Sequence, residues 1–395
     1  MKILYIPLQF FPIQWWYSLA SSNFLKSIEN IDDLSVTILT HTKLLNNQEF
    51  FIKNWTVKRI NLWWSSFLHL FFLQFILFFK VFNSHKDYDF VFFETWESAM
   101  SIFLLSFLKV LNKKLIVRFH ASTDTEWLMW YPRLELRIRK ILLKIWLKKI
   151  NYIFSTNQYH LSFVKKYFFD SNIYEISKKK FFVLPNTLSL DENDIEFNEL
   201  DIEENKYFLI LWRLSIQWFL EKWIDDIILS LIFLKNNNFD FRWNKFVIIW
   251  NWDKKEHIKK LIVNNWLEKE VLLLDSLDNK KIHSLQKKSR ACIMNSRLEW
   301  CSMFALECIF NWWLLIASNV WGLKDMVVDW YNWYFVKPQN IQDLSDKIWK
   351  VILMSDNDIK LFKLNSHKIY EEKFSNKKIS SDFINILKIL KSNNV

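Results

Sequence analysis

Short runs of apolar residues alternate with helical patterns along the whole chain. Each run consists mainly of Val, Ile, Leu, Phe and Tyr, as in strands that are buried on both faces. The runs predict strands at 2–7, 34–40, 89–94, 114–120, 151–156, 180–186, 207–212, 245–251, 270–275, 291–296, 313–318 and 333–338. Strands of this type form parallel sheets covered by helices. The pattern therefore predicts an α/β protein with two Rossmann-like domains.

A polar, acidic stretch separates the two series of strands. Residues 191–205 hold eight carboxylates in 15 residues and are the best candidate for a linker. We expect an N-terminal domain at 1–190, this linker, a C-terminal domain at 206–365 and a helical tail at 366–395. The length of 395 residues agrees with two domains, because a single core stops growing at roughly 250–300 residues.

Composition is typical of a globular protein and excludes a disordered one, with 51% hydrophobic and 24% charged residues. The net charge of +11 arises in the first half, where 1–190 hold 24 Lys and Arg against 13 Asp and Glu. This basic half favours an anionic partner, either nucleic acid or anionic lipid. Cys292, Cys301 and Cys308 form no metal-type pair, which favours a reducing cytoplasm.

The residue counts contain one anomaly, a single glycine beside 23 tryptophans. Globular proteins carry roughly 7% glycine, and here the sum of 23 + 1 = 24 residues is about 6% of the chain. Tryptophan also stands where turns need glycine, as in DWYNWYF at 329–335, which has D-W and N-W for D-G and N-G. We infer that most of these positions are glycine, encoded by UGA in a bacterial lineage that reads this codon as glycine.

The alternative is a tryptophan-rich protein that binds aromatic groups, but it leaves the turns without a residue suited to positive φ. Trp146 and Trp349 stay candidates for true tryptophan. The chain as written is expected to be inactive or poorly folded, because tryptophan would fill the expected ligand-binding loops at 15, 16, 212, 250 and 252.

Two motifs in the second half carry residues suited to binding a sugar and a phosphate. In SRLEWCSMFALECIF, Glu299 precedes a predicted helix and Glu307 lies two turns along it. Carboxylates accept hydrogen bonds from sugar hydroxyls. In LILWRLSIQWFLEKWIDD, Arg213 and Lys222 are cations that would neutralise a diphosphate. Alone, each pair is more typical of a solvated surface.

Three further motifs follow predicted strands, where open α/β sheets place their ligands. LQFFPIQWWYSLAS contains Trp15 and Trp16, and KFVIIWNWDKKEH contains Trp250 and Trp252. Small residues at these positions would let backbone N–H groups approach an anion. IVRFHAS places His120 at the end of its strand, although a lone histidine is usually structural.

With glycine at the tryptophan positions, these motifs resemble the retaining GT-B glycosyltransferases of family four, the group 1 glycosyl transferases. The resemblance covers nearly the whole chain and implies two Rossmann-like domains whose parallel sheets face a central cleft. It implies transfer of a sugar, with retention, from a nucleotide-sugar donor to a hydroxyl acceptor, without a metal ion or a cofactor. The acceptor would be a glycan or a lipid-linked precursor of surface polysaccharide or glycolipid, bound by the N-terminal domain.

The resemblance also implies roles for single residues. The catalytic residues would be His120, Arg213, Lys222 and Glu299. The donor would be bound by Trp15, Trp16, Arg213, Lys222, Trp250, Ser302, Met303 and Glu307, with glycine at the tryptophan positions. Ser302 departs from the family, which commonly has glycine there. The Asp87-Tyr88-Asp89 string precedes a strand, and we interpret it as structural rather than as a Mg²⁺ site.

Residues 133–149 offer an explanation for the basic first half. They place Arg137, Lys140, Lys144 and Lys148 on one helical face, and such helices can lie on anionic membranes. An ordinary surface helix is the alternative, and nucleic acid is disfavoured because no recognition module is visible. We expect a cytoplasmic protein, with a peripheral location on the inner face of the plasma membrane as the extension of this hypothesis. The most apolar stretch, 65–82, falls short of the roughly 20 residues of a membrane span.

Two alternatives to a sugar transferase stay open. One is a non-catalytic GT-B protein that acts as a membrane-associated binding module. The other is a GT-B sugar-nucleotide epimerase, which product analysis would distinguish.

Overall fold

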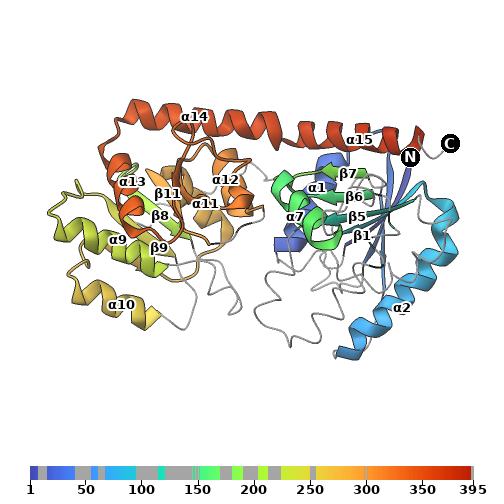
Figure 1. Ribbon diagram of the computed structural model, residues 1–395, viewed down its shortest axis with the longest axis horizontal. Coiled ribbons are helices and arrows are strands. Elements are labelled where there is room, and N and C mark those ends of the chain that lie inside the picture. Colours follow the sequence, from blue (N-terminus) through green and yellow to red (C-terminus); the bar gives the residue numbers. More distant parts are fainter. Residues whose placement is uncertain are drawn as a thin grey trace. The chain divides into compact units, whose positions relative to one another are not determined.

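The computed structural model describes most of the chain, namely residues 1–7, 16–40, 55–60, 67–94, 114–120, 145, 147, 150, 152–169, 180–189, 203–211, 224–249, 255–297, 299 and 301–392. The chain forms two compact units, both visible in Figure 1. The first unit contains Met1–Ser189 and Phe374–Val395, and the second contains Leu190–Lys373.

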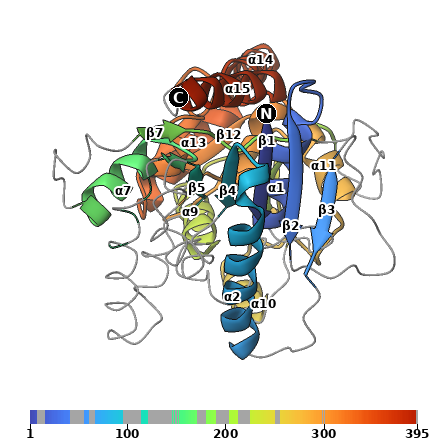
Figure 2. The same cartoon turned by 90° about the vertical axis from the view of Figure 1, so that its right-hand side faces the viewer.

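The first unit is built on a seven-stranded sheet in the order β3-β2-β1-β4-β5-β6-β7. All of its strand pairs are parallel, and Figure 2 shows the central strands side by side. Its elements are β1 Lys2–Pro7, α1 Trp16–Ile28, β2 Ser35–Thr40, β3 Thr56–Arg59, α2 Phe67–Ser84, η1 His85–Asp87, β4 Phe90–Glu94, β5 Leu115–Phe119, β6 Tyr152–Ser155, α7 Gln158–Phe169, β7 Lys180–Val183 and α15 Asn376–Ser392.

The second unit repeats this design with a six-stranded parallel sheet in the order β10-β9-β8-β11-β12-β13. Its elements are β8 Tyr207–Leu211, α9 Ile224–Asn236, β9 Lys245–Ile249, α10 Lys255–Asn264, β10 Val271–Leu274, α11 Asn279–Lys288, β11 Ala291–Met294, α12 Met303–Phe310, β12 Leu315–Ser318, η4 Trp321–Leu323, β13 Tyr334–Val336, α13 Ile341–Leu353 and α14 Asp356–Lys373.

The predicted α/β architecture with two parallel sheets is confirmed, and each of the twelve predicted strands is present with ends shifted by a few residues. The prediction omitted β3, whose sequence is TVKR and whose side chains are exposed or half-buried. Such an edge strand lacks the apolar run that marks a buried strand.

In both sheets the strand order reverses at one point, between β1 and β4 in the first unit and between β8 and β11 in the second. Ligands of open parallel α/β sheets bind outside the carboxyl ends of the strands at such a switch point. β4 ends at Glu94 and β11 ends at Met294. The residues at and after these two strand ends are therefore the first places to look for function.

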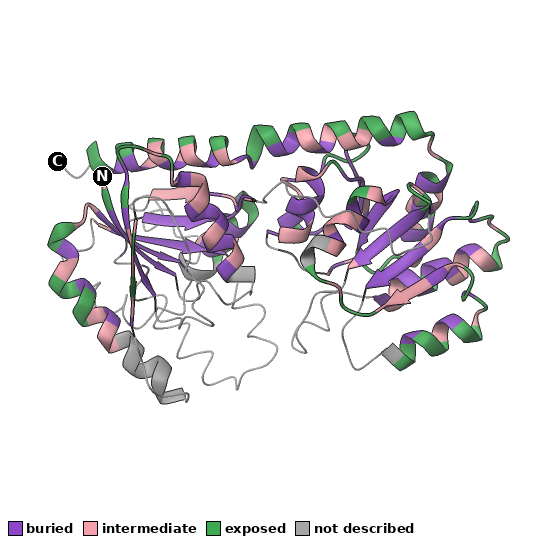
Figure 3. Cartoon of the chain, turned by 180° about the vertical axis from the view of Figure 1, so that it is seen from behind, coloured by how far each residue is buried: buried purple, intermediate pink, exposed green. Residues whose placement is uncertain are grey.

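The first sheet is covered on both faces, because alternate side chains of a strand point to opposite sides. Ile3 and Tyr5 of β1 face a cluster that includes α1 and α15. Leu4 and Ile6 face a second cluster that includes Leu77 and Val81 of α2. Figure 3 shows the buried strands at the centre of each unit. The C-terminal helix is thus part of the first core, where Phe383 packs edge-on against Phe24 at 5.1 Å between ring centroids.

Three helices of the second unit end in the same way, with a residue of positive φ just after the helix. In α10, Leu267 N–H donates to Ile262 O and Trp266 N–H donates to Val263 O, which is the Schellman pattern. The left-handed residue of that motif is normally glycine or asparagine. These residues, with their φ angles, are Asn238 (58°) after α9, Trp266 (56°) after α10 and Trp312 (62°) after α12.

Two turns also place tryptophan in the left-handed region. Arg242 and Trp243 have φ of 50° and 66°, and Asn244 N–H closes the turn onto Phe241 O at 2.8 Å. Positive φ at both central residues defines a type I′ turn, which favours Asn-Gly. Trp330 follows Asp329 in the predicted D-W turn and has φ of 65°.

Other tryptophans lie in ordinary structure. Trp313 and Trp333 are fully buried in the second unit, and Trp333 Nε1–H donates to Trp313 O at 3.0 Å. Trp349 lies inside α13 and packs on Phe239 with ring centroids 4.7 Å apart. Positions 243, 266, 312 and 330 therefore differ from these three in needing a left-handed backbone.

Candidate functional site

The predicted carboxylate pair lies after β11, at the switch point of the second sheet. Glu299 is in the loop before α12 and Glu307 is inside the helix, as the pattern predicted. Glu307 is buried, with only 3% of the residue exposed. Glu299 accepts a hydrogen bond from Ser296 Oγ at 3.0 Å, and its carbonyl accepts from Gly322 N–H at 2.8 Å. These contacts fix the loop that carries Glu299.

Ser302 and Met303 form the start of α12. Ser302 is the N-cap, since its Oγ accepts from Ala305 N–H at 3.3 Å. This hydroxyl satisfies one of the N–H groups that a helix leaves open at its first turn. Ser302 thus has a local structural role as the N-cap of this helix. The remaining N–H groups of this turn give the helix start its preference for an anion.

A polar chain that the sequence analysis missed joins α9, β11 and β12. Asn295, just after β11, donates from Nδ2 to Asp226 Oδ2 at 3.3 Å and accepts from Ser318 Oγ at 2.9 Å. Burial raises the pKa of Asp226 and Asn295 opposes this shift. Because Asp226 is in the first turn of α9, these hydrogen bonds fix the start of that helix beside the switch point.

In the first unit, Glu94 ends β4 and His120 follows β5, and both are buried. His120 Nε2 lies 3.2 Å from Glu94 Oε1, and Arg118 Nη1 lies 2.8 Å from the same oxygen. Ser21 Oγ of α1 donates to Glu94 Oε2. Burial raises the pKa of Glu94, but His120 and Arg118 outweigh this effect and lower it to about 2. Glu94 is therefore ionised at neutral pH.

Arg118 connects this carboxylate to the segment after β7. Its Nη2 donates to Leu184 O, Pro185 O and Asn186 Oδ1 at 3.0, 2.9 and 3.0 Å. An arginine with no exposure needs such partners, because an unpaired buried charge is costly. The residue is thus structural, and it holds the segment 184–186 against β5.

The sequence contains a signal for the buried pair of Glu94 and Arg118. The strand segments FVFFE and LIVRF each contain one charged side chain among apolar residues. Charged residues are almost never fully buried unless they are paired. An acidic and a basic side chain on two consecutive predicted strands therefore indicate a buried ion pair.

Other predicted site residues fall outside the described part of the chain, namely Trp15, Arg213, Lys222 and Trp250. Trp16 begins α1, but its side chain is outside the description as well. The same holds for Lys140, Lys144 and Lys148 of the predicted basic helix. The diphosphate contacts and the basic helix therefore stay predictions.

The Asp87 to Asp89 string has a structural partner. Asp89 Oδ2 accepts from Lys2 N–H at 2.9 Å, and Oδ1 lies 3.2 Å from Lys391 Nζ. These contacts join the start of β1 to α15.

The three cysteines are buried free thiols. Within the described ranges, no helix has the length and apolar character to cross a membrane.

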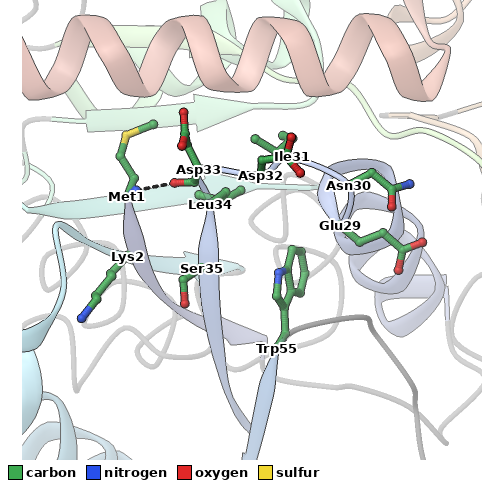
Figure 4. Close-up of a pocket in the computed structure, with 10 residues that line it drawn as sticks. All are labelled: Met1, Lys2, Glu29, Asn30, Ile31, Asp32, Asp33, Leu34, Ser35 and Trp55. Carbon is green, nitrogen blue, oxygen red and sulfur yellow. Dashed lines mark hydrogen bonds between the residues drawn. The ribbon is translucent and has the colours of Figure 1, made fainter.

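A hollow of about 600 Å³ lies at the amino ends of the strands of the first sheet, opposite the carboxyl ends (Figure 4). It is lined by the amino ends of β1 and β2, the end of α1 and Trp55, and Met1 N donates to Asp33 O at its rim. Parallel α/β sheets bind ligands at the carboxyl ends of their strands. We therefore assign this hollow no role in the site.

Comparison with known proteins found a family match for part of the chain. Residues 192–365 match the sequence model of the family described as Glycosyl transferases group 1. This segment contains Glu299, Ser302, Met303 and Glu307. A search of curated proteins found no matching sequence.

Solved structures resemble the whole chain at low sequence identity. Sucrose-phosphate synthase from Thermosynechococcus elongatus has a TM-score of 0.74 with 13% identity over 99% of both chains. The lipopolysaccharide outer core galactosyltransferase WaaB has a TM-score of 0.66 with 17% identity over 98% of both chains. HepE from Anabaena, solved with UDP and glucose, has a TM-score of 0.64 with 15% identity over 98% of this chain and 99% of its own. The chain thus has the two-domain α/β fold of GT-B glycosyltransferases, and its second unit carries the match to the group 1 family.

Proposed function

We propose that the protein is a retaining glycosyltransferase that moves a sugar from a nucleotide-sugar to a hydroxyl acceptor. The observation that carries the proposal is the group 1 match over 192–365, which covers the carboxylate pair at the switch point of the second sheet. HepE was solved with UDP and glucose, which supports a nucleotide-sugar as the donor. WaaB is named as a lipopolysaccharide galactosyltransferase, which supports a surface glycan or glycolipid precursor as the acceptor.

The proposed chemistry is electrostatic stabilisation of the leaving nucleoside diphosphate. Arg213 and Lys222 would neutralise its charge, and N–H groups at the start of α12 would face it. Glu299 would contact the donor sugar and Glu307 the ribose. In this scheme His120 of the first unit contacts the sugar, and the reaction uses no metal ion.

A donor screen with product analysis tests this proposal. A nucleotide-sugar that raises the melting temperature should also be consumed with a suitable acceptor, and Glu307→Gln should weaken its binding by about ten-fold or more. NMR of the product should show the donor's anomeric configuration. Binding without transfer to any acceptor would favour the non-catalytic alternative, and a changed sugar on the nucleotide would favour the epimerase.

We further propose that most tryptophan positions are glycine in the protein made by its own cells. Trp243, Trp266, Trp312 and Trp330 have φ between 56° and 66°, where only glycine is free of steric cost. The left-handed residue after α9 is Asn238, and asparagine is the residue that most often replaces glycine at this position. Mass spectrometry of peptides from the native protein tests each position separately, and tryptophan at all four would overturn the proposal.

The same data would decide the other tryptophans. Trp349 packs inside α13 and is the best candidate for a true tryptophan. Trp313 and Trp333 fill the second core, so glycine there would require neighbouring side chains to close the space. UGG codons at the four left-handed positions would contradict the recoding.

We also propose that the first unit lies on anionic lipid. The predicted basic helix at 133–149 motivates this, and α2 supports it. Phe79 and Phe82 of α2 are 57% and 43% exposed, beside exposed Lys80, while the other face of the helix is in the core. Phenylalanine beside lysine is typical of surfaces that enter a membrane interface. Flotation with anionic vesicles should therefore weaken in Phe79→Ser/Phe82→Ser, and unchanged flotation there and in Lys140→Glu/Lys144→Glu/Lys148→Glu would contradict the proposal.

A further inference from the structure

The first residue after β11 anchors the loop that leads to α12. Asn295 Nδ2 donates to Asp226 Oδ2 of α9 at 3.3 Å, and Asn295 Oδ1 accepts from Ser318 Oγ at 2.9 Å. An ionised carboxylate can only accept, so the amide nitrogen is the end that faces Asp226. The side chain thus links α9, which follows β8, to the ends of β11 and β12, and these three strands are neighbours in the sheet.

The other contacts of this loop hold one of the residues proposed to bind the donor. Ser296 Oγ donates to Glu299 Oε1 at 3.0 Å, and Glu299 O accepts from Gly322 N–H at 2.8 Å. Ser302 then caps α12 at the end of the same loop. Asn295 therefore fixes the base of a loop whose other contacts place Glu299 and the first turn of α12.

Packing alone does not explain a carboxylate at the start of α9. Burial raises the pKa of Asp226, the hydrogen bond from Asn295 and the charge of Arg297 lower it, and Asp225 of the same turn raises it. Asp225 itself lies 3.7 Å from His257 of α10. An apolar residue of similar size would pack there without the cost of removing a carboxylate from water. The acid and the amide instead make a directional contact that fixes α9 against the loop.

We infer that Asn295 is a positioning residue of the donor site, which acts through Asp226 and Ser318 to hold the β11–α12 loop where Glu299 meets the donor. The inference rests on the proposed function for the role of Glu299. The contacts of Asn295 themselves belong to the second unit alone. Misplacement of a binding group by about 1 Å can cost on the order of a hundred-fold in rate, so loss of this anchor should weaken the site.

Exchange of the acid and the amide tests the contact. The full-length protein, with its native residues at the tryptophan positions, is titrated with UDP-glucose, GDP-mannose and ADP-glucose by calorimetry. Asn295→Asp places a second carboxylate against Asp226 and should weaken donor binding by about ten-fold or more. Asp226→Asn/Asn295→Asp reverses the pair, so an amide again donates to a carboxylate that also accepts from Ser318. This double variant should regain most of the affinity.

The pH dependence separates this contact from a general effect of charge. Two adjacent carboxylates share a proton as the pH falls. The loss in Asn295→Asp, relative to the unmodified protein at the same pH, should therefore be smaller at about pH 5.5 than at about pH 8. The double variant should show no such difference. Asn319→Asp is the matched control, because it adds the same charge to an exposed residue next to Ser318, and it should keep the affinity of the unmodified protein.

A second variant covers the case in which Asn295→Asp does not fold. Ser318→Ala removes the donor to Asn295 Oδ1 and should weaken donor binding by about three-fold or more. Unchanged affinity in both variants overturns the inference, and so does a loss in Asn295→Asp that the exchange does not recover. A protein that binds none of the three nucleotide-sugars contradicts the proposed function, and the role of Asn295 falls with it.

Discussion

Replacing Trp243 and Trp266 with glycine is expected to stabilise the second unit. Both residues are mostly exposed, at 89% and 78%, so removal of the indole loses little buried area. The left-handed conformation costs a residue with a Cβ about 1–2 kcal/mol. Part of this gain, about 0.5–1 kcal/mol, is lost because glycine has more conformational freedom in the unfolded chain. The net gain is about 0.5–1 kcal/mol for each position, and about 1–2 kcal/mol for the double variant if the two effects add.

Trp312 and Trp330 should respond less, because their rings have partners. Trp312 stacks on His367 with centroids 4.4 Å apart, and Lys350 Nζ lies 4.3 Å above the Trp330 ring. Each such contact contributes about 0.5–1 kcal/mol. The loss of the contact and the relief of the backbone nearly cancel. The order of the four positions is therefore itself a test of the reasoning.

The assay is thermal and urea unfolding of the full-length chain, with Trp349→Gly as the matched control. The double variant should melt roughly 2–8 °C higher. Trp349→Gly should instead lose about 3 kcal/mol, because it removes the packing on Phe239 and puts glycine inside a helix. If Trp243→Gly and Trp266→Gly both lower stability, or if Trp349→Gly raises it as well, left-handed strain is not what distinguishes these positions.

Three further predictions concern the buried polar groups. Burial and the neighbouring His120 lower the pKa of His160 to about 3. Below pH 6.5 the unfolded chain therefore binds more protons than the folded chain, and the free energy of unfolding decreases as the pH is lowered. We expect a loss of about 2 kcal/mol between pH 7 and pH 5, and urea titrations of His160→Gln should show a smaller loss. Arg118→Met should cost about 3–5 kcal/mol because it leaves Glu94 unpaired, whereas a cost below 1 kcal/mol in chemical unfolding would mean that the pair contributes little. Ser302→Ala should lower stability by about 1 kcal/mol through the lost N-cap of α12, and Ser302→Asp should keep it, since aspartate caps equally well.

The strands were predictable because parallel strands buried on both faces carry their own signature. KFVII and VLLL become β9 and β10 almost as the apolar runs predict. β3 was not predictable in this way, because TVKR at the sheet edge has two charged side chains and no apolar run. Its place is fixed by the parallel pairing with β2, from Thr37 opposite Thr56 to Thr40 opposite Arg59. Pairing of that kind is a long-range property that a local pattern does not contain.

The dipeptides of Asp or Asn with tryptophan predicted the left-handed turns only in part. The D-W dipeptide at Asp329 and Trp330 predicted a left-handed residue, and Trp330 has positive φ. The N-W dipeptide at Asn332 and Trp333 predicted another, but Trp333 does not have positive φ and is buried. Trp243 follows Arg242, and no such dipeptide marks its turn.

Trp266 stands in NNWLEK and follows Asn265, so an N-W dipeptide marks the left-handed residue there. Its conformation follows from the end of α10, where Leu267 must turn back so that it and Ile262 both reach the core. The need for a left-handed residue there arises from tertiary packing.

The buried pair of the first unit shows a further limit of local patterns. The positions of Glu94 and His120 in the sequence predict only that each ends a strand. Their contact depends on the order β1-β4-β5, which brings the carboxyl end of β4 beside that of β5. In that register Glu94 lies opposite Arg118, and the residue two positions further along the chain is His120. A carboxylate at a strand end, an arginine opposite it and a histidine two residues later therefore form a pattern across strands, and the energetic cost of burying each charge alone is what links them.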